Sequence, residues 1–178
     1  MERVLLDDKA IERSISRIAH EILEKNQGSK NLSLIGIRTR GIFLAKRIRD
    51  KIEEIEGRVL PFGILDITMY RDDIARMKAT LEVKKTDIPF DVNDMTIVLV
   101  DDVLYTGRTT RAAIDAIMDL GRPKKIQLAV LIDRGSRELP IQPDYTGIRY
   151  SAVTEEEEVS VRLREMDGQD AVLLSKTL

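Results

Sequence analysis

The sequence predicts an α/β domain in which helices cover a mostly parallel sheet. One reason is a set of apolar runs at residues 32–37, 97–100 and 126–132, which are typical of strands buried on both faces. Another is that helical patterns separate these runs, in the order strand, helix, strand, long loop, strand, helix, strand. The length of 178 residues corresponds to about one domain of roughly 150 residues. We therefore expect a single domain over residues 1–178.

Each element is assigned from the spacing of its apolar residues. Between residues 9 and 25, isoleucines recur every three or four positions, which predicts a helix with one buried face. Asp7 and Asp8 precede this helix as candidate N-caps, and Gly28 follows it. The other predicted elements are a strand at 32–37, a polar turn at 38–41, a helix from there to Gly57, a strand at 60–70, a strand at 97–100, a helix at 109–120 and a strand at 126–132.

Two segments lie outside this alternation. Residues 71–96 are charged and lack a period, and loops this long in compact domains are usually functional or disordered. Residues 136–178 form a hood and tail attached to the same domain. Within the tail we expect a loop at 136–150, a solvated acidic turn at 155–158, and an antiparallel hairpin that pairs 159–163 with 171–174.

Composition narrows the classes of function. With 43% hydrophobic and 34% charged residues and a formal charge of -2, the chain can bury a core but lacks a generally basic nucleic-acid coat. Aromatic residues are only 4%, so no base-stacking platform is expected. The absence of Cys and the presence of one histidine, His20, exclude disulfides and most metal sites or triads built on these residues. No signal peptide or membrane span is found, so we expect a cytoplasmic protein without membrane contact.

The segment at residues 97–109 carries the strongest chemical signal. Its apolar strand ends in two adjacent carboxylates, Asp101 and Asp102, and ligands of open α/β folds bind at the carboxyl ends of such strands. Thr106, Gly107 and Thr109 follow and lead into a helix, whose free N–H groups favour a phosphate. A ribose 5-phosphate satisfies both features. The alternative is a helix cap or surface turn, in which two neighbouring carboxylates would repel each other without a ligand or cation.

Residues 97–109 resemble the phosphoribosyl pyrophosphate (PRPP) motif of the type I phosphoribosyltransferases, and residues 100–109, followed by 119–123, closely resemble one family within them. Within that superfamily the sequence is most similar to the bifunctional pyrimidine-operon attenuator and uracil phosphoribosyltransferase (PyrR) family. Further matches lie at residues 17–21, 39–42, 66–73 and 133–135. The resemblance implies the type I phosphoribosyltransferase fold, with a mostly parallel central sheet flanked by helices and a small C-terminal hood or hairpin.

The resemblance also implies a reaction and its partners. Uracil and PRPP would give uridine monophosphate (UMP) and pyrophosphate, with Mg²⁺ arriving on the pyrophosphate and no metal held by protein ligands alone. UMP or UTP and a leader hairpin of pyrimidine-operon messenger RNA are further implied partners, and a homo-oligomer of dimer size or larger is expected. Residues 71–96 would act as a lid that excludes water from the reacting atoms.

Site residues follow from the same matches. Asp101, Asp102 and Arg71 are the implied catalytic residues. A guanidinium in the turn at 38–41, where family members often carry a non-proline cis peptide, suits a diphosphate, although that turn taken alone reads as an ordinary surface turn. The implied contacts of PRPP or UMP are Thr39, Arg40, Lys84, Asp101, Asp102, Val103, Leu104, Tyr105, Thr106, Gly107, Arg108, Thr109, Arg134 and Tyr150.

Tyr105 bears on the choice of base. In 6-oxopurine phosphoribosyltransferases the matching position is an Asp that serves N7 of the purine, and a neutral phenol near pH 7 does this poorly. Uracil is therefore expected in preference to hypoxanthine or guanine. A phosphoribosyltransferase for another base, such as adenine or xanthine, stays an alternative because backbone groups read much of the base.

An RNA-binding face is implied on the first predicted helix and just after the last strand of the sheet. The implied RNA contacts are Arg13, Ser16, Arg17, His20 and Arg137. Ser136, Gln142 and Ile148 depart from the family, which usually carries His, Arg and Lys there, so cationic contacts with phosphates are lost. A plain solvated helix face is one alternative. Another is an RNA-binding regulator whose enzyme activity is vestigial.

Overall fold

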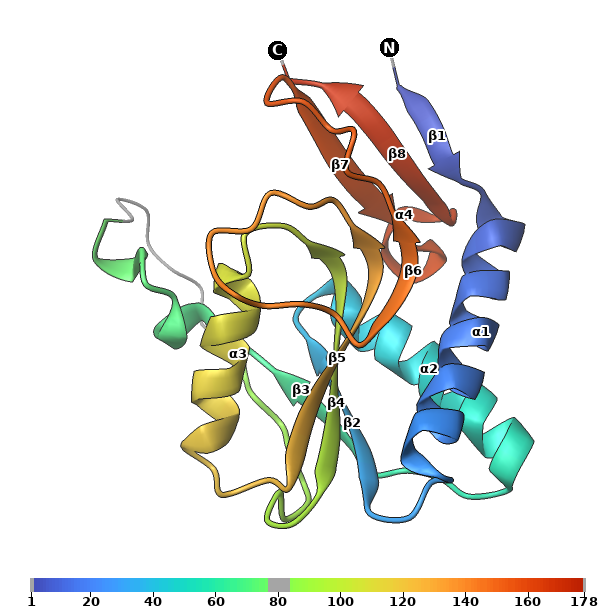
Figure 1. Ribbon diagram of the computed structural model, residues 1–178, viewed down its shortest axis with the longest axis vertical. Helices are drawn as coiled ribbons and strands as arrows, with labels where there is room; N and C mark the ends of the chain where they lie inside the picture. Colours follow the sequence, from blue (N-terminus) through green and yellow to red (C-terminus); the bar gives the residue numbers. More distant parts are fainter. Residues whose placement is uncertain (1, 77–83, 178) are drawn as a thin grey trace.

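The computed structural model describes residues 2–76 and 84–177 and confirms the α/β class. Five parallel strands form the main sheet in the order β3-β2-β4-β5-β6, and three antiparallel strands form a small sheet in the order β1-β8-β7. Figure 1 shows the small sheet beyond one end of the main sheet, with both chain termini on it. The elements are β1 (Arg3–Leu6), α1 (Asp8–Asn26), β2 (Leu32–Ile37), α2 (Arg40–Glu56), β3 (Phe62–Leu65), β4 (Thr96–Leu104), α3 (Arg108–Met118), β5 (Lys125–Asp133), β6 (Tyr145–Arg149), β7 (Glu157–Arg162), α4 (Arg164–Asp167) and β8 (Ala171–Lys176), with short 3₁₀ turns at Thr68–Tyr70 and Ile74–Arg76.

Helix α1 forms as its sequence predicts. The Asp7 side chain accepts a hydrogen bond from the Ala10 backbone N–H at 2.8 Å and caps the helix, while Asp8 is its first residue. The helix ends at Asn26, and Gln27 takes a left-handed conformation that satisfies the last carbonyls. Its isoleucines are buried, and Arg13, Arg17 and His20 are exposed. The predicted division between a core face and a solvent face is therefore confirmed.

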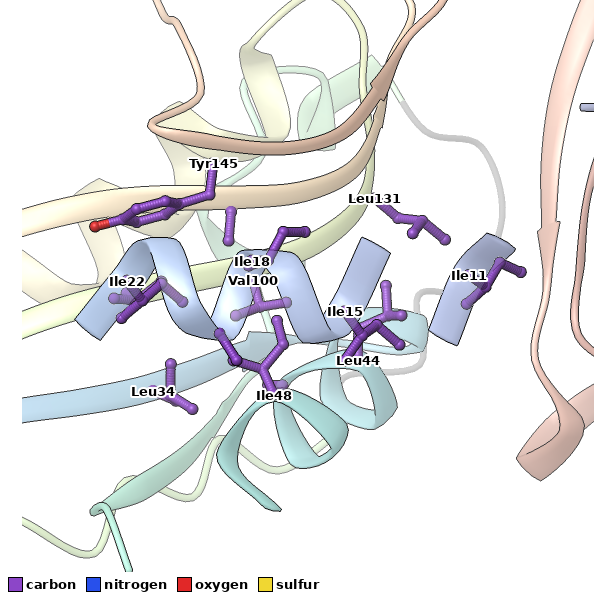
Figure 2. Packing of buried hydrophobic residues seen from close by; sticks show 14 of the residues in the cluster. Ile11, Ile15, Ile18, Ile22, Leu34, Leu44, Ile48, Val100, Leu131 and Tyr145 are labelled. Atoms are coloured by element: carbon purple, nitrogen blue, oxygen red, sulfur yellow. The ribbon is translucent and has the colours of Figure 1, made fainter. Parts of the chain in front are cut away.

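Two apolar layers cover the faces of the main sheet. In the layer shown in Figure 2, α1 and α2 pack their isoleucines and leucines against Leu34, Val100 and Leu131 of the sheet. On the opposite face α3 packs against Ile35 and Leu99. Neighbouring residues of one strand thus enter different layers, which explains the continuous apolar runs of β2 and β4.

Several predicted boundaries are wrong. The strand expected at 60–70 is shorter, because β3 ends at Leu65 and a 3₁₀ turn follows. Strand β4 continues through the two carboxylates to Leu104. Residues 136–150, expected as a loop, contain β6, and two residues of the acidic run at 155–158 belong to β7. Strand β1 was not predicted, and it pairs with β8 at the other end of the chain.

The hairpin of the tail is confirmed, with β7 and β8 antiparallel. The predicted lid at 71–96 includes residues 77–83, which lie outside the described part of the chain, so its closure stays a prediction. The described parts of that segment hold the turn at Ile74–Arg76 and a bridge between Ile64 and Asp87. Among the described residues, no helix combines the length and the apolar character needed to cross a membrane.

Candidate active site

The two adjacent carboxylates lie on β4, close to its carboxyl end. Asp101 is buried and Asp102 is half-buried, and both line a cleft of about 400 Å³. The backbone N–H of Asp102 donates to Asp101 Oδ1 at 2.9 Å, and that of Val103 donates to Asp102 Oδ1 at 2.8 Å. These bonds fix both carboxylates at the edge of the sheet where ligands of parallel sheets bind. The other residues that line this cleft are Arg38, Thr39, Asp66, Ile67, Thr68, Arg71, Lys84, Val103 and Thr109.

Burial sets the charge state of this pair. Removal from water raises the pKa of Asp101 well above its usual value, and the neighbouring charge of Asp102 raises it further. Hydroxyl donors of a ligand would therefore stabilise the charged form of Asp101 beside Asp102.

The turn after β4 has the form of a phosphate cradle. Gly107 adopts a φ of 94°, a conformation that favours glycine, and α3 begins at the next residue. The Thr106 carbonyl accepts from the backbone N–H groups of Glu138 and Leu139 at 2.9 and 3.1 Å, so a second loop supports the turn from behind. The backbone N–H of Arg108 donates to Thr106 Oγ1 at 3.3 Å, and the N–H groups that follow in the first turn of α3 lack a partner within the helix, which favours an anion.

A second cleft of about 270 Å³ adjoins this turn. It is lined by Arg71, Asp72, Asp73, Thr106, Arg108 and Thr109, and Arg71 and Thr109 are shared with the first cleft. Arg108 does not point freely into it, because its guanidinium pairs with Asp72 and with Glu138. Arg71 pairs with Asp73 through two hydrogen bonds of 2.9 and 2.8 Å. Guanidinium groups thus surround the cradle while carboxylates of the same chain neutralise them.

The turn before α2 forms the opposite wall of the first cleft. The peptide bond between Arg38 and Thr39 is cis, as the resemblance implied. Arg38 and Thr39 line the cleft, and Arg38 Nη2 donates to the carbonyl of Lys85 at 2.8 Å. Arg40 does not line it: its Nη2 donates to both carboxylate oxygens of Asp167, at 3.1 and 3.3 Å. Arg40, which the resemblance assigns to pyrophosphate, therefore points to the C-terminal tail in this structure. Arg38 lines the cleft instead.

Sequence reasoning missed Asp66 and Thr68 as parts of the wall. Asp66 Oδ1 accepts from the N–H and the hydroxyl of Thr68 at 2.9 and 2.6 Å, and Oδ2 accepts from the backbone N–H of Lys84 at 2.6 Å. Partial burial acts to raise the pKa of Asp66, but these hydrogen bonds outweigh it and hold the pKa below its usual value. A signal was present, because both residues directly follow β3 at the edge where β4 also ends.

Three further residues that the resemblance assigns to the substrate, Tyr105, Arg134 and Tyr150, lie just before the cradle in sequence or after the end of β5. The Arg134 guanidinium stacks on the Tyr105 ring, 3.9 Å from its centroid, and Tyr105 is 43% exposed. Tyr150 is half-buried, and its backbone N–H donates to the Asp133 carbonyl at 2.8 Å. The side chain of Leu104 is buried in the core, so only its backbone is left for the predicted contact with a substrate.

The residues implied in RNA binding fall into two groups. Arg13 and His20 are exposed on α1, and Ser16 is half-buried beside them. Arg17 instead donates to the backbone carbonyls of Thr146 and Gly147 in β6.

Arg137 is also engaged inside the fold. It pairs with Asp133 at 2.8 Å and donates to the carbonyls of Ile141 and Tyr105 at 2.8 and 3.0 Å, with only 14% of its side chain exposed. Arg17 and Arg137 thus have structural partners that sequence reasoning did not foresee.

The three departures from the family also differ in setting. Ser136 and Gln142 are exposed, whereas Ile148 is half-buried and packs against the layer that contains α1. Arg149, next along β6, is exposed and supplies a cation near that position. A Lys at position 148 would have to extend its charged end out of this packing.

Comparisons with known proteins agree with this geometry. Residues 3–164 match the phosphoribosyl transferase domain family. The chain is 58% identical to the Bifunctional protein PyrR of Pelotomaculum thermopropionicum over 97% of this chain and 95% of that one. It is 53% identical to the Bifunctional protein PyrR of Bacillus subtilis, over 96% and 95%.

Solved structures show the same fold at lower identity. A hypoxanthine phosphoribosyltransferase of Staphylococcus aureus superposes with a TM-score of 0.71 at 18% identity, over 99% of this chain and 92% of that one. The hypoxanthine phosphoribosyltransferase of Trypanosoma cruzi superposes with a TM-score of 0.73 at 14% identity, over 99% of this chain and 97% of that one. At such identities the likeness concerns the fold alone. The sequence relatives are closer, and from them the chain belongs to the phosphoribosyl transferase family and, within it, to the PyrR family of bifunctional proteins.

Proposed function

We propose that the chain transfers a phosphoribosyl group from PRPP to uracil, giving UMP and pyrophosphate. The observation that carries the proposal is that the cleft lined by Asp101 and Asp102 adjoins the cleft of the phosphate cradle at 106–109, with Arg71 and Thr109 shared by both, in a chain of this family. In the reaction, a bond forms between N1 of uracil and C1 of the ribose, and the bond from C1 to the pyrophosphate oxygen breaks. The N1 proton leaves to solvent or to the pyrophosphate.

The residues would act mainly by positioning and by charge. Asp101 and Asp102 would accept hydrogen bonds from the ribose 2- and 3-hydroxyls, and the N–H groups at the start of α3 would hold the 5-phosphate. Thr39 would face the pyrophosphate from the opposite wall, and Arg71, shared by both clefts, would lie between the two anionic ends. Lys84 lines the same cleft and would add positive charge near the leaving group.

The side chains present fit a magnesium ion carried by the substrate. Within residues 2–76 and 84–177 no group of three or more His, Asp or Glu side chains gathers as a metal cage. Mg²⁺ keeps several waters and binds substrate phosphates through few protein ligands, so the carboxylate of Asp102 in the cleft suffices to hold such a hydrated ion. The ion would supply neutralisation of the negative charge that develops on pyrophosphate.

The base would lie between the cradle and the residues that follow β5. Tyr105 and Arg134 would form the sides of the base site, and Tyr150, in the C-terminal hood, would cover the base. A tyrosine does not accept from a purine N7 as a carboxylate does, which favours uracil. Competition of uracil with hypoxanthine, guanine, adenine and xanthine at saturating PRPP, with the products separated, tests this choice. Predominant turnover of any purine would contradict the assignment of uracil.

We propose further that the protein regulates pyrimidine-operon expression by binding a leader hairpin in a manner that depends on uridine nucleotides. The supporting observations are the bifunctional relatives and the exposed side chains of Arg13 and His20 on α1, with Arg149 on β6. Gel-shift titrations of a leader hairpin with and without UMP or UTP test it, and an affinity that ignores both nucleotides would contradict it. The expected homo-oligomer is tested by light scattering of the purified protein.

Gln142→Arg is the sharpest test of the lost RNA contacts, because this position is exposed. One added phosphate contact would steepen the slope of log affinity against log salt by about one unit. Titrations at several salt concentrations measure it. An unchanged slope would show that position 142 does not face the RNA.

A further inference from the structure

Arg38 and Thr39 form the wall of the cleft that would face pyrophosphate, and the start of α2 just after them is held from two sides. From inside, Gly41 touches β4, since a Cβ at this position would overlap the carbonyl oxygen of Val100, next to Asp101. From outside, Arg40 is held by Asp167 of the tail, 127 residues away in sequence. The two residues before Arg40 line the cleft. Whatever fixes Arg40 therefore also fixes the backbone that faces the leaving group.

Arg40 needs a counter-charge where it stands. It is the first residue of α2, where the helix dipole is positive, and the first turn of α2 has no acidic residue and no side-chain cap. Its Nε is buried without a hydrogen-bond partner among the described residues, and Asp167 receives its Nη2. Only 32% of the Arg40 side chain and 23% of the Asp167 side chain are exposed, so solvent screens this pair incompletely.

Asp167 is preorganised for this contact. Its Oδ2 accepts from the backbone N–H of Leu163 at 2.8 Å, and Oδ1 makes the shorter of the two contacts with Arg40 Nη2, at 3.1 Å against 3.3 Å for Oδ2. The short helix α4 that carries it is fastened to α2 at a second point, where Arg47 binds Glu165 through two hydrogen bonds of 2.9 and 2.6 Å. The tail therefore docks on α2 at two places, two helical turns apart, and only one of them touches the turn of the cleft.

We propose that Asp167 is a positioning residue for the pyrophosphate end of the site and acts through Arg40. By holding Arg40 on the tail side, it sets the backbone of Arg38 and Thr39 for PRPP and pyrophosphate. The proposal deepens the proposed phosphoribosyl transfer and rests on it. It assigns part of the substrate site to the C-terminal tail.

The test compares Asp167→Asn with Glu165→Gln. In Asp167→Asn the side-chain oxygen can still accept from Leu163, so the NH₂ group then faces the Arg40 guanidinium and repels it. Glu165→Gln weakens the docking of α4 at the other place and leaves Arg40 untouched. For Asp167→Asn we expect KM for PRPP and the Kd of pyrophosphate to rise about three- to tenfold, the scale of one ordinary hydrogen bond because the effect is indirect, with KM for uracil unchanged. Asp167→Glu should recover part of the loss.

Calorimetric binding of PRPP and of pyrophosphate separates this proposal from the identity of the base, because it needs no turnover. A wild-type chain that binds PRPP but does not convert uracil would refute the proposed reaction and leave the comparison of variants valid. Equal effects of the two variants on PRPP binding would overturn the positioning role and leave a merely structural one. Unchanged PRPP and pyrophosphate affinity in a folded Asp167→Asn variant would overturn it as well.

Discussion

Replacement of both carboxylates of β4 by amides, Asp101→Asn with Asp102→Asn, should abolish catalysis without unfolding the protein. Each side chain uses Oδ1 to accept a backbone N–H within the strand, and asparagine retains that oxygen. The change therefore removes charge and preserves the local hydrogen bonds. It also removes a repulsion, since burial and the neighbouring charge raise the pKa of Asp101.

The expected loss follows from the ribose contacts. Hydrogen bonds to a charged group are worth about 1.5–3 kcal/mol each, so two of them correspond to about 3–6 kcal/mol. At 1.36 kcal/mol per factor of ten, kcat/KM should fall by about 10²- to 10⁴-fold. Steady-state UMP formation at saturating uracil measures this loss, and the residual rate fixes its size.

Stability provides the internal control. A carboxyl whose folded pKa lies above its unfolded value takes up protons on folding, so it lowers stability as pH rises between the two values. The double variant should therefore melt at or above the wild-type temperature at neutral pH, and the gain should shrink as pH falls toward about 4. A destabilisation of 1 kcal/mol would lower Tm by about 2–4 °C, which a thermal melt resolves. Near-normal turnover in the folded double variant would refute the assignment of these carboxylates to ribose.

Two further predictions concern ion pairs that the sequence did not reveal. Asp170 is buried against the side chains of Arg47 and Arg164. Burial acts to raise the pKa of Asp170, but the hydrogen bonds and charges of the two arginines outweigh it and hold that pKa well below its usual value. Its pairing thus adds stability above the unfolded pKa of about 4, which is lost as pH falls toward the folded value. Asp170→Asn should cost about 3–5 kcal/mol at neutral pH by chemical denaturation, with a smaller difference in acid; a cost independent of pH would contradict the ion-pair account. Arg137→Ala should impair both UMP formation and RNA binding, because Arg137 supports the base end through Asp133 and Tyr105, whereas Arg13→Ala should impair RNA binding alone. Full enzyme activity in a stable Arg137→Ala variant would show that this support is dispensable.

Strand β6 shows why part of the fold could not be predicted. Its five residues include Gly147 and two polar or charged residues, and neither an alternating nor a continuous apolar pattern results. The strand forms because β5 offers a paired edge, and a glycine is needed because a Cβ at 147 would overlap the carbonyl oxygen of Leu131. Strand β1 is a similar case, since its partner β8 lies at the far end of the chain. Pairing partners this distant leave no local signal.

The residues of the site likewise divide into those that are contiguous in sequence and those that only the fold brings together. Asp101, Asp102 and the turn at 106–109 are contiguous, so their chemistry could be predicted from one stretch of sequence. Asp66 follows a different strand, and it becomes part of the site because parallel strands β3, β2 and β4 end at one edge of the sheet. Such residues were within reach of the argument from strand ends. The contact of Arg40 with Asp167 was not, because it joins a helix start to a tail through tertiary packing alone.

The contacts of Arg17 explain how one small domain can serve two activities. Arg17 lies on the α1 face implied in RNA binding, and it holds the carbonyls of Thr146 and Gly147 in β6. The residue that follows β6, Tyr150, is bonded to the end of β5 beside the base site. A nucleotide at the proposed base site and a ligand on α1 would therefore both adjoin residues that contact β6. Strand β6 is an edge strand that pairs with β5 and contacts α1, so it would link the two ligands physically.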